Sequence, residues 1–252
     1  LVAGVATGAV FLKRGFSLGR EHDTNKAAGT VLPIALVVLL IISLTLTVMA
    51  VSESGPGSKH APWIISLAVA LVIGALAQKT RICFIGGVRN VILMRDFSLL
   101  IPIVGLFAVM AIYNVATGGF KLSFDGQPIA HAQHLWNILG LYAVGFAGTL
   151  AGGCPLRQMI LAGQGSCDGA MTFLGMLIGA AFAHNFGLAG AAAAAATADT
   201  PAVAGGPSLA GQVVLVAGIA VLFVIAFTNQ KKKKAAAAKA TPAVSAPVAS
   251  EA

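Results

Sequence analysis

Long runs of apolar residues alternate with short polar stretches along most of the chain. The runs cover residues 1–12, 31–51, 62–78, 97–117, 135–151, 170–189 and 209–228. Most of them approach the ~20 residues that an α-helix needs to cross the hydrocarbon core of a bilayer. The pattern therefore predicts an all-α integral membrane protein, a polytopic helical bundle with seven spans.

Composition supports this class, and charge gives the orientation. Of the 252 residues, 58% are apolar and 10% are charged, and the mean hydropathy is +0.90, values typical of integral membrane proteins. Loops rich in Lys and Arg stay in the cytoplasm. If the odd-numbered spans end inside, only Lys59 and Lys121 lie outside. The fourteen basic residues on the inner side are then Lys13, Arg14, Arg20, Lys26, Lys79, Arg81, Arg89, Arg95, Arg157, the four lysines at 231–234 and Lys239.

We therefore expect a multi-pass protein of the bacterial cytoplasmic (inner) membrane, with its C-terminal tail in the cytoplasm. Its expected partner is the lipid bilayer. The net charge of +8 follows mostly from the bias toward the inner side and from the tail, so nucleic acid is not an expected partner.

A short similarity indicates an inverted repeat. GAVF at 8–11 and GAAF at 179–182 are each followed by a short, partly polar stretch and then by another apolar run. The copies lie five spans apart, so they would cross the membrane in opposite directions, as repeats of secondary transporters do. Residues 1–51 would then be the remnant of a first repeat that lacks about three spans, and 62–228 the second repeat. Residues 229–252 would form a disordered basic and Ala/Pro-rich tail.

A glycine-rich break with a cysteine separates the fifth and sixth apolar runs. Gly152 and Gly153 allow a sharp turn and close approach of a ligand. Pro155 suits the first position of a short helix, which makes Cys154 its N-cap. The free N–H groups and positive dipole end of that helix favour an anion. Because irregular backbone within a bilayer survives only inside protein or beside water, we interpret the break as half of a transport site, with Arg157 one turn below the thiol.

A second break with the same features follows the third apolar run. The segment RICFIGGVRN at 81–90 contains Arg81, Cys83, Gly86, Gly87 and Arg89. A lone cysteine is typically a small buried hydrophobe, and a lone arginine there is typically an anchor at the inner surface. The recurrence of Cys, Gly-Gly and Arg at two breaks favours a functional interpretation. It predicts that Cys83 and Cys154 face each other across a narrow path, within reach of a shared ligand.

Other polar residues carry weaker signals. Cys167 lies in a second glycine-rich stretch beyond the predicted short helix, and Asp168 suits the cap of the helix that follows. Asp125, His131 and His134 share an outer loop but are too few to hold a metal, so we expect a solvated loop. We expect no metal, no cofactor and no catalytic residue.

The two cysteine motifs carry a resemblance to a known family. RICFIGGVRN, followed two spans later by AGGCPLRQMILAGQG at 151–165, resembles the YeeE/YedE sulfur-transport membrane family. The GGCPLRQ form and GMLIGAAFAHNFGLA at 175–189 are similar to the YedE branch associated with selenium metabolism. The resemblance covers roughly residues 1–228. It implies a pseudo-symmetric transporter whose short helices meet in mid-membrane and whose cysteines, here Cys83 and Cys154, pass a sulfur-containing anion inward. A family member would carry a matching motif upstream, so this chain would hold half of the pathway.

Three classes of function stay open. A transporter or channel for a small sulfur or selenium anion fits best, because a thiol is a weak donor on a polarisable sulfur. A membrane thiol redox enzyme or sulfurtransferase would need a CxxC pair or a base beside the thiol, which the sequence does not show, so we expect no enzyme. A structural membrane subunit would not need the cysteines. A cytoplasmic protein that accepts sulfur or selenium is a candidate partner.

Overall fold

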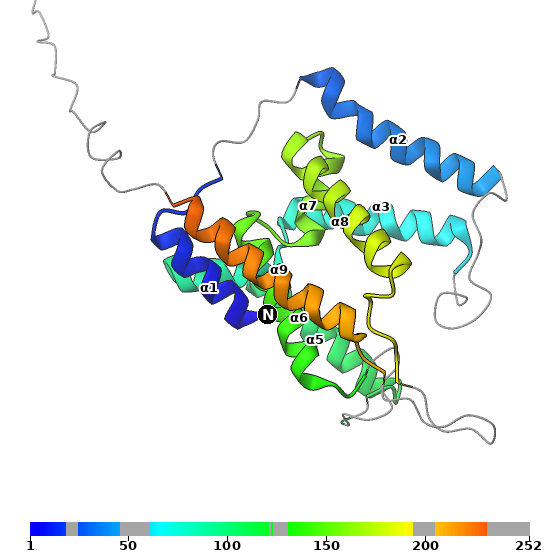
Figure 1. Cartoon of the computed structure of the whole chain (residues 1–252). Coiled ribbons are helices and arrows are strands. Elements are labelled where there is room, and N and C mark those ends of the chain that lie inside the picture. Colours follow the sequence, from blue (N-terminus) through cyan, green and yellow to red (C-terminus); the bar gives the residue numbers. More distant parts are fainter. Residues whose placement is uncertain (19–24, 46–60, 121, 123–130, 194–204, 231–252) are drawn as a thin grey trace, which may run out of the picture.

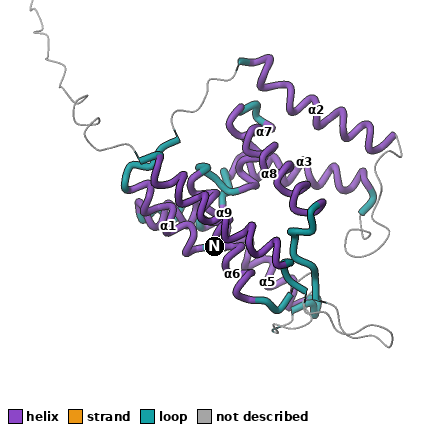
Figure 2. The backbone as a smooth tube through the Cα atoms, in the orientation of Figure 1, coloured by secondary structure: helices purple, strands orange, loops and turns teal. Residues whose placement is uncertain are grey.

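All regular structure in the described residues is helical. The computed structural model describes residues 1–18, 25–45, 61–120, 122, 131–193 and 205–230 (Figures 1 and 2). The helices in chain order are α1 (Val2–Lys13), α2 (Lys26–Thr45), α3 (Trp63–Thr80), α4 (Phe84–Met94), α5 (Ile101–Ala116), α6 (His134–Leu150), α7 (Pro155–Gly163), α8 (Cys167–Asn185) and α9 (Leu209–Thr228). The predicted all-α class is confirmed. Residues 231–252, for which we predicted a disordered tail, lie outside this part of the chain, as do Asp125, Lys59 and Lys121.

Part of the helical structure is long and apolar enough to cross a membrane. The segment Trp63–Met94, which comprises α3, α4 and the break between them, has this property, as do α8 and α9. Helices α6 and α7 meet at a bend of 40° and form a fourth candidate if they are counted as one broken span. Apolar but shorter helices are α1, residues Gly29–Thr45 of α2, and α5. The chain is thus a helical membrane protein with three or four full-length candidate spans in its described part.

The observed helix ends follow local rules, with one correction. Helix α9 occupies the predicted residues 209–228. Helix α5 begins at Ile101, later than the predicted start at 97, and Pro102 lies in its first turn. Proline is tolerated there because the first N–H groups of a helix have no intrahelical partner. Pro102 therefore lies at the start of α5 and not in its interior.

One packed unit is built from α1, α4, α6 and α9. Helix α1 lies along α6 and also touches α4 and α9, and α6 packs on α9 (Figure 1). The centre of this unit is aromatic, with the ring centroid of Phe11 4.9 Å from that of Phe227 and that of Phe146 4.9 Å from that of Phe223. Edge-to-face and tilted rings at such distances stabilise a core beyond their buried area.

Small residues let α1 and α6 approach closely. A Cβ on Gly4 would collide with the Tyr142 carbonyl oxygen, and a Cβ on Gly145 would collide with the Leu1 carbonyl oxygen. Close backbone approach at glycine is the usual way in which membrane helices associate. A Cβ at Gly140, Gly175 or Gly179, in contrast, would meet no atom within 4 Å. These three glycines lie on surfaces that no described helix covers.

A second group of helices surrounds α7. Helices α7 and α8 pack tightly, and α2 and α3 lie against them from outside (Figure 1). Apolar side chains on α2 and α3 are largely exposed, and Ala77 is the buried residue of α3. Exposed apolar helix faces of this kind suit contact with lipid, since lipid tails are as apolar as the side chains. The break between α6 and α7 joins the two groups and positions the candidate site.

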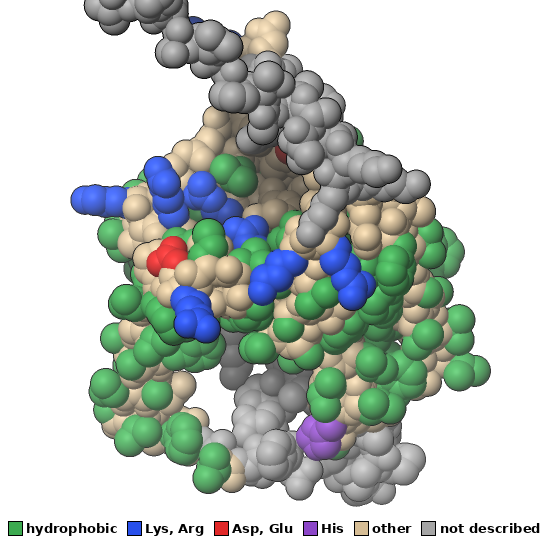
Figure 3. Space-filling model, turned by 90° about the vertical axis from the view of Figure 1, so that its left-hand side faces the viewer, with side chains coloured by type: hydrophobic (Ala, Val, Ile, Leu, Met, Phe, Trp, Pro, Cys, Tyr) green, Lys and Arg blue, Asp and Glu red, His purple; other side chains and the backbone are tan. Residues whose placement is uncertain are grey.

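Basic side chains gather at one level of the molecule. The described basic residues are Lys13, Arg14, Lys26, Lys79, Arg81, Arg89, Arg95 and Arg157, and all belong to the side that the charge bias assigned to the cytoplasm. Figure 3 shows Lys and Arg side chains in a band across one face, with hydrophobic side chains below the band and a histidine near the opposite end. This arrangement fits one membrane surface rich in positive charge.

Candidate functional site

The break between α3 and α4 places Cys83 at the start of a helix. Arg81 follows α3 in the left-handed conformation, with φ 52°. These dihedral angles end the right-handed helix, and residues other than glycine adopt them at a cost. Cys83 is extended, with φ −153° and ψ 109°, and is the N-cap of α4. Its Sγ accepts a hydrogen bond from the Gly86 N–H at 3.2 Å. The thiol sulfur thus occupies the position of a capping oxygen.

The break between α6 and α7 has the predicted geometry. Gly152 has φ +84°, a conformation that favours glycine. Cys154 is extended, with φ −73° and ψ 162°, and is the N-cap of α7, which begins at Pro155. The short helix that Pro155 predicted is therefore confirmed. The Cys154 side chain makes no capping hydrogen bond to its own helix.

The two breaks meet at the sulfur of Cys83. The Cys154 N–H donates a hydrogen bond to Cys83 Sγ at 3.3 Å, so this sulfur accepts one N–H from the first turn of α4 and one from the N-cap of α7. Cys83 is 5% exposed and Cys154 is 2% exposed, and both are free thiols in one buried cluster with Val5 and Ile85. The two breaks therefore meet and both sulfurs are buried, whereas the narrow path and the shared ligand between the thiols remain predictions.

The paired glycines allow this close approach. A Cβ on Gly86 would lie 3.0 Å from Cys83 Sγ, and one on Gly87 would lie 3.0 Å from Ile103 Cδ1 of α5. A Cβ on Gly153 would lie 3.3 Å from Gln158 Nε2. All three separations are tighter than ordinary van der Waals contact. Gly86 and Gly153 therefore leave room for the groups around the thiols, whereas Gly87 leaves room for a neighbouring helix.

The three candidate arginines have different surroundings. Arg89 donates from Nη1 to the Gly152 carbonyl oxygen at 3.4 Å and from Nη2 to Asn90 Oδ1 at 3.3 Å, and so ties α4 to the other break. Arg157 donates from Nη1 to Gln78 Oε1 at 3.2 Å, which ties α7 to α3. Arg81 is exposed. Only Arg89 of these three lines the cavity beside the breaks.

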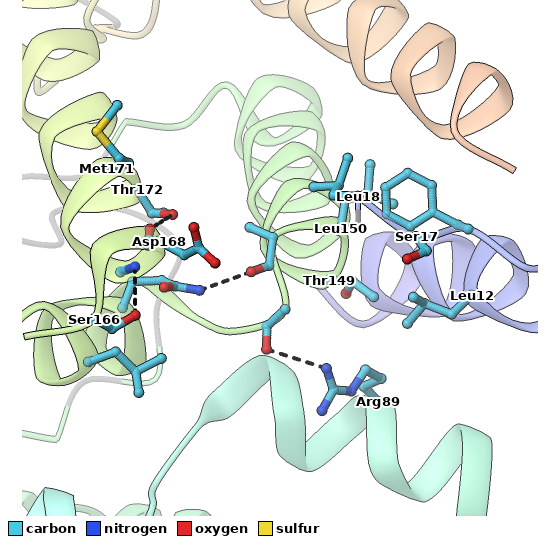
Figure 4. A pocket seen from close by; sticks show the side chains of 16 residues that line it. Leu12, Ser17, Leu18, Arg89, Thr149, Leu150, Ser166, Asp168, Met171 and Thr172 are labelled. Carbon is cyan, nitrogen blue, oxygen red and sulfur yellow. Dashed lines mark hydrogen bonds between the residues drawn. The ribbon is translucent and has the colours of Figure 1, made fainter. Parts of the chain in front are cut away.

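A cavity of about 630 Å³ opens beside the second break. Its wall consists of Leu12, Phe16, Ser17, Leu18, Arg89, Thr149, Leu150, Ala151, Gly152, Gln158, Leu161, Ser166, Asp168, Gly169, Met171 and Thr172 (Figure 4). The thiols of Cys83 and Cys154 are not part of this wall. Gly152, two residues before Cys154, belongs to both the wall and the break. The cavity and the second break therefore share this glycine.

Sequence reasoning missed three buried polar residues at the site. Asn90, Thr149 and Gln158 are buried. Gln158 donates from Nε2 to the Ala151 carbonyl oxygen at 3.0 Å, which satisfies a carbonyl at the end of α6, and Asn90 accepts from Arg89. The sequence does contain a signal for two of them, because an amide residue, Asn90 or Gln158, directly follows the arginine of each motif. A buried amide inside an apolar helix needs a hydrogen-bond partner.

The remaining candidates stand apart from the thiols. Cys167 is exposed and is the first residue of α8, not a loop residue as we expected. The cap of α8 is Ser166, whose Oγ accepts from the Gly169 N–H at 3.2 Å, so Asp168 lies in the first turn and is not the cap. His131 and His134 belong to the start of α6 and the residues before it, and the described residues contain no group of three or more side chains suited to a metal.

Comparison with known proteins gave one match. A family model described as sulphur transport matches residues 79–250. Both helix breaks, and therefore both buried cysteines, lie inside the matched residues. No curated protein and no solved structure matches the chain.

Proposed function

The chain belongs to the sulphur transport family, whose model matches about two thirds of it, and on this basis we propose that it carries a small sulfur-containing anion inward across the bacterial cytoplasmic membrane. The family match and the apolar helices indicate a multi-pass membrane protein that takes part in transport. What we propose beyond this is the substrate, its route through the protein and the direction of transport.

The observation that carries the proposal is the pair of N–H groups on Cys83 Sγ. One comes from Gly86 in the first turn of α4 and the other from Cys154, the N-cap of α7, so the N-terminal ends of two helices meet at one sulfur. The N-terminal end of a helix favours an anion, because it carries a partial positive charge and N–H groups that have no partner within the helix. The polarisable sulfurs of Cys83 and Cys154 suit a ligand with a soft sulfur atom. An anion that contains sulfur satisfies both requirements.

The route we propose leads from the thiol pair to the cavity. The anion would pass from Cys83 and Cys154 over the Gly152–Gly153 turn to Arg89, which lies on the cavity wall. Arg89 belongs to the basic band, which faces the cytoplasm in the orientation we propose. A series of weak sites suits conduction, because the ion must leave each site as readily as it enters.

The proposal also includes an alternative substrate and a partner protein. Selenium-containing anions are the alternative substrate, since a soft selenium atom suits the same thiols. A cytoplasmic protein that accepts the sulfur or selenium from the inner cavity is the partner we propose. Uptake of labelled thiosulfate compared with labelled selenite, in vesicles that contain the protein, decides between the substrates.

A second candidate function is thiol chemistry at the same cysteines. The sequence shows no CxxC pair, but the fold brings two free thiols together across 71 positions of sequence. Thiosulfate could transfer its sulfane sulfur to one thiol with release of sulfite, and the persulfide so formed could pass that sulfur to the other thiol, which restores the first. The series of substitutions below separates this chemistry from transport by contact.

The first prediction concerns the two buried thiols. Cys154→Ser keeps a donor but loses the soft sulfur, and Cys154→Ala loses both. Contact transport predicts that Ser lowers the initial rate of thiosulfate uptake by about tenfold, the scale of one lost interaction, and that Ala lowers it further. Cys83 variants should behave alike, because the steps are in series. Cys167→Ala is the matched control and should keep the wild-type rate, since this thiol is exposed and lies outside the cluster.

Three outcomes distinguish the functions. Equal loss in Ser and Ala variants, together with a persulfide on the wild-type protein in mass spectrometry, would establish the thiol enzyme instead. Wild-type uptake in the double variant Cys83→Ala/Cys154→Ala would refute both mechanisms. Wild-type protein that carries neither thiosulfate nor selenite would contradict the proposed transport of these anions.

A further inference from the structure

Asn90 holds the guanidinium of Arg89 from one side. Its Oδ1 accepts hydrogen bonds from Arg89 Nε at 3.4 Å and from Arg89 Nη2 at 3.3 Å. Both donors meet the same atom of the amide, which must be the oxygen because the amide nitrogen is itself a donor. Asn90 is 8% exposed, and a polar side chain that is buried to this degree needs a hydrogen-bond partner. The contact is therefore a fixed feature of α4 and not a chance approach of two surface side chains.

The other contact of Arg89 crosses to the second break. Nη1 donates to the Gly152 carbonyl oxygen at 3.4 Å, as the dashed line beside Arg89 in Figure 4 shows. A guanidinium has five N–H groups, and these contacts use three of them. One N–H on Nη1 and one on Nη2 are left without a partner among the described residues. Because Arg89 lines the cavity beside the break, an anion in that cavity is a ligand that these donors can bind.

Donors on two neighbouring nitrogens recognise two oxygens of one anion. A guanidinium binds carboxylate and phosphate groups through two parallel N–H···O bonds, and this mode depends on the orientation of its plane. The sulfonate-like end of thiosulfate presents oxygens in a similar arrangement, whereas hydrosulfide has no oxygen. An arginine with a fixed plane therefore distinguishes these two kinds of sulfur anion. A lysine would not, because an ammonium group acts as a point charge.

We propose that Asn90 is a positioning residue, which holds Arg89 so that its two remaining N–H groups bind two oxygens of the anion in the cavity. The anion is then one that carries both oxygen and a soft sulfur atom, as thiosulfate does, and hydrosulfide is a poor ligand. The inference rests on the proposed transport of a small sulfur anion and narrows the class of that anion. Asn90 does not line the cavity, so it acts through Arg89.

A purely structural role for Asn90 makes a different prediction. In that role the amide only satisfies polar groups and stabilises α4, so its loss would weaken the protein whichever cation stands at position 89. In the positioning role, the loss matters only while a guanidinium is present. A double-mutant cycle separates the two roles, because it measures whether two substitutions act independently.

The test measures the Kd for thiosulfate on purified protein in nanodiscs. Asn90→Leu removes the acceptor and should raise the Kd by about tenfold, the scale of one hydrogen bond to a charged group. Arg89→Lys keeps the charge but loses the paired donors, so it should raise the Kd as well. When Asn90→Leu is added to Arg89→Lys, the Kd should change by less than about twofold further, because no plane is left to orient.

Gln78 provides the matched control. Its Oε1 accepts from Arg157 Nη1 at 3.2 Å, so Gln78 is also an amide that holds an arginine. Neither of these two residues lines the cavity. Gln78→Leu should therefore change the Kd for thiosulfate by less than about twofold.

A second pair of variants applies if Asn90→Leu does not fold. Asn90→Asp keeps the shape of the side chain and an acceptor oxygen, but its charge offsets that of Arg89. The Kd for thiosulfate should then rise by about tenfold or more. The equivalent change Gln78→Glu offsets the charge of Arg157 outside the cavity, and should raise the Kd by less than about threefold.

Competition in the wild type tests the class of anion. Hydrosulfide cannot accept through oxygen, so it should displace labelled thiosulfate at least about tenfold less effectively than unlabelled thiosulfate does. Equally effective displacement by hydrosulfide would contradict recognition of the oxygens by Arg89.

The outcomes separate the inference from the function beneath it. A wild-type Kd in Asn90→Leu, or the same rise in Kd with and without Arg89→Lys, would overturn the positioning role and leave transport standing. Equal effects of Asn90→Asp and Gln78→Glu would do the same. Wild-type protein that binds no thiosulfate, and that carries none into vesicles, would overturn thiosulfate transport and the positioning role with it.

Discussion

At the scale of residues, the choice of cysteine at two helix N-caps is not explained by helix stability. Ser, Thr, Asp and Asn cap helices better than other residues, and either motif could have used one. Cys83 does cap α4 through its sulfur, whereas Cys154 makes no capping bond to α7. Sulfur at both positions therefore points to a property that oxygen lacks, and its polarisability is the property that a sulfur-containing ligand would use.

A prediction at this scale compares two arginines. Arg89 lines the cavity, whereas Arg157 is half-buried against Gln78. Loss of a charged hydrogen-bond donor at the anion's route should raise the KM for thiosulfate uptake in Arg89→Gln by about tenfold or more. Arg157→Gln should raise KM by less than about threefold, because Arg157 bonds to Gln78 and does not line the cavity. A larger effect at Arg157 than at Arg89 would contradict the route through the cavity.

At the scale of elements, the packing of α1 on α6 holds the end of α6 that leads into the second break. Gly4 and Gly145 let the two backbones touch, and Gly8 packs on Thr149 at the end of α6, where a Cβ would lie 2.6 Å from the Thr149 Cβ. Thr149 in turn donates to the Gly145 carbonyl oxygen at 2.7 Å. The last turn of α6 is thereby fixed where the chain enters the break.

Two glycines of α6 give a matched test of this packing. A Cβ at Gly145 would enter the backbone of α1, whereas one at Gly140 would meet nothing within 4 Å. Overpacking costs about 1–3 kcal/mol, so Gly145→Ala should lower the Tm of the detergent-solubilised protein by about 4 °C or more. Gly140→Ala should keep or raise the Tm, since alanine favours helices over glycine. Equal Tm values for the two variants would argue against the close contact of α1 and α6.

At the scale of the whole molecule, charge and apolar surface are arranged for a bilayer. Lys and Arg side chains form a band across one face (Figure 3), and α2, α3 and α5 carry long exposed apolar faces. Helix α1, which we assigned to the remnant of a first repeat, packs inside the unit formed by α4, α6 and α9. The division into repeats remains a prediction, as does the orientation of the band toward the cytoplasm.

Labelling of one cysteine tests this orientation. Cys167 is exposed at the start of α8, and the other two cysteines are buried, so a membrane-impermeant maleimide should modify Cys167 alone. We expect modification in inside-out vesicles and none in intact spheroplasts, because the charge bias places Cys167 inside. In the control variant Cys167→Ser/Pro62→Cys, the new thiol should show the reverse pattern. Modification of Cys167 from outside the spheroplast would reverse the topology.

The sequence by itself determined the features that depend on neighbouring residues. Apolar runs of membrane length gave the helices, α9 to the residue, because the bilayer requires every backbone group to be bonded within the helix. Gly152, Cys154 and Pro155 defined the second break, since their backbone preferences act locally. Charge bias gave the basic side. These features need no knowledge of how helices pack.

Only the tertiary structure decided which groups meet. Cys83 and Cys154 are 71 positions apart, and their contact depends on the packing of α1, α4 and α6. Packing also placed Arg89 and Asp168 on one cavity and turned Arg157 toward Gln78. It buried Gly145 while leaving Gly140 open on the same helix. Helical periodicity fixes which residues share a face, but the neighbour of each face is set by the fit of side chains between helices.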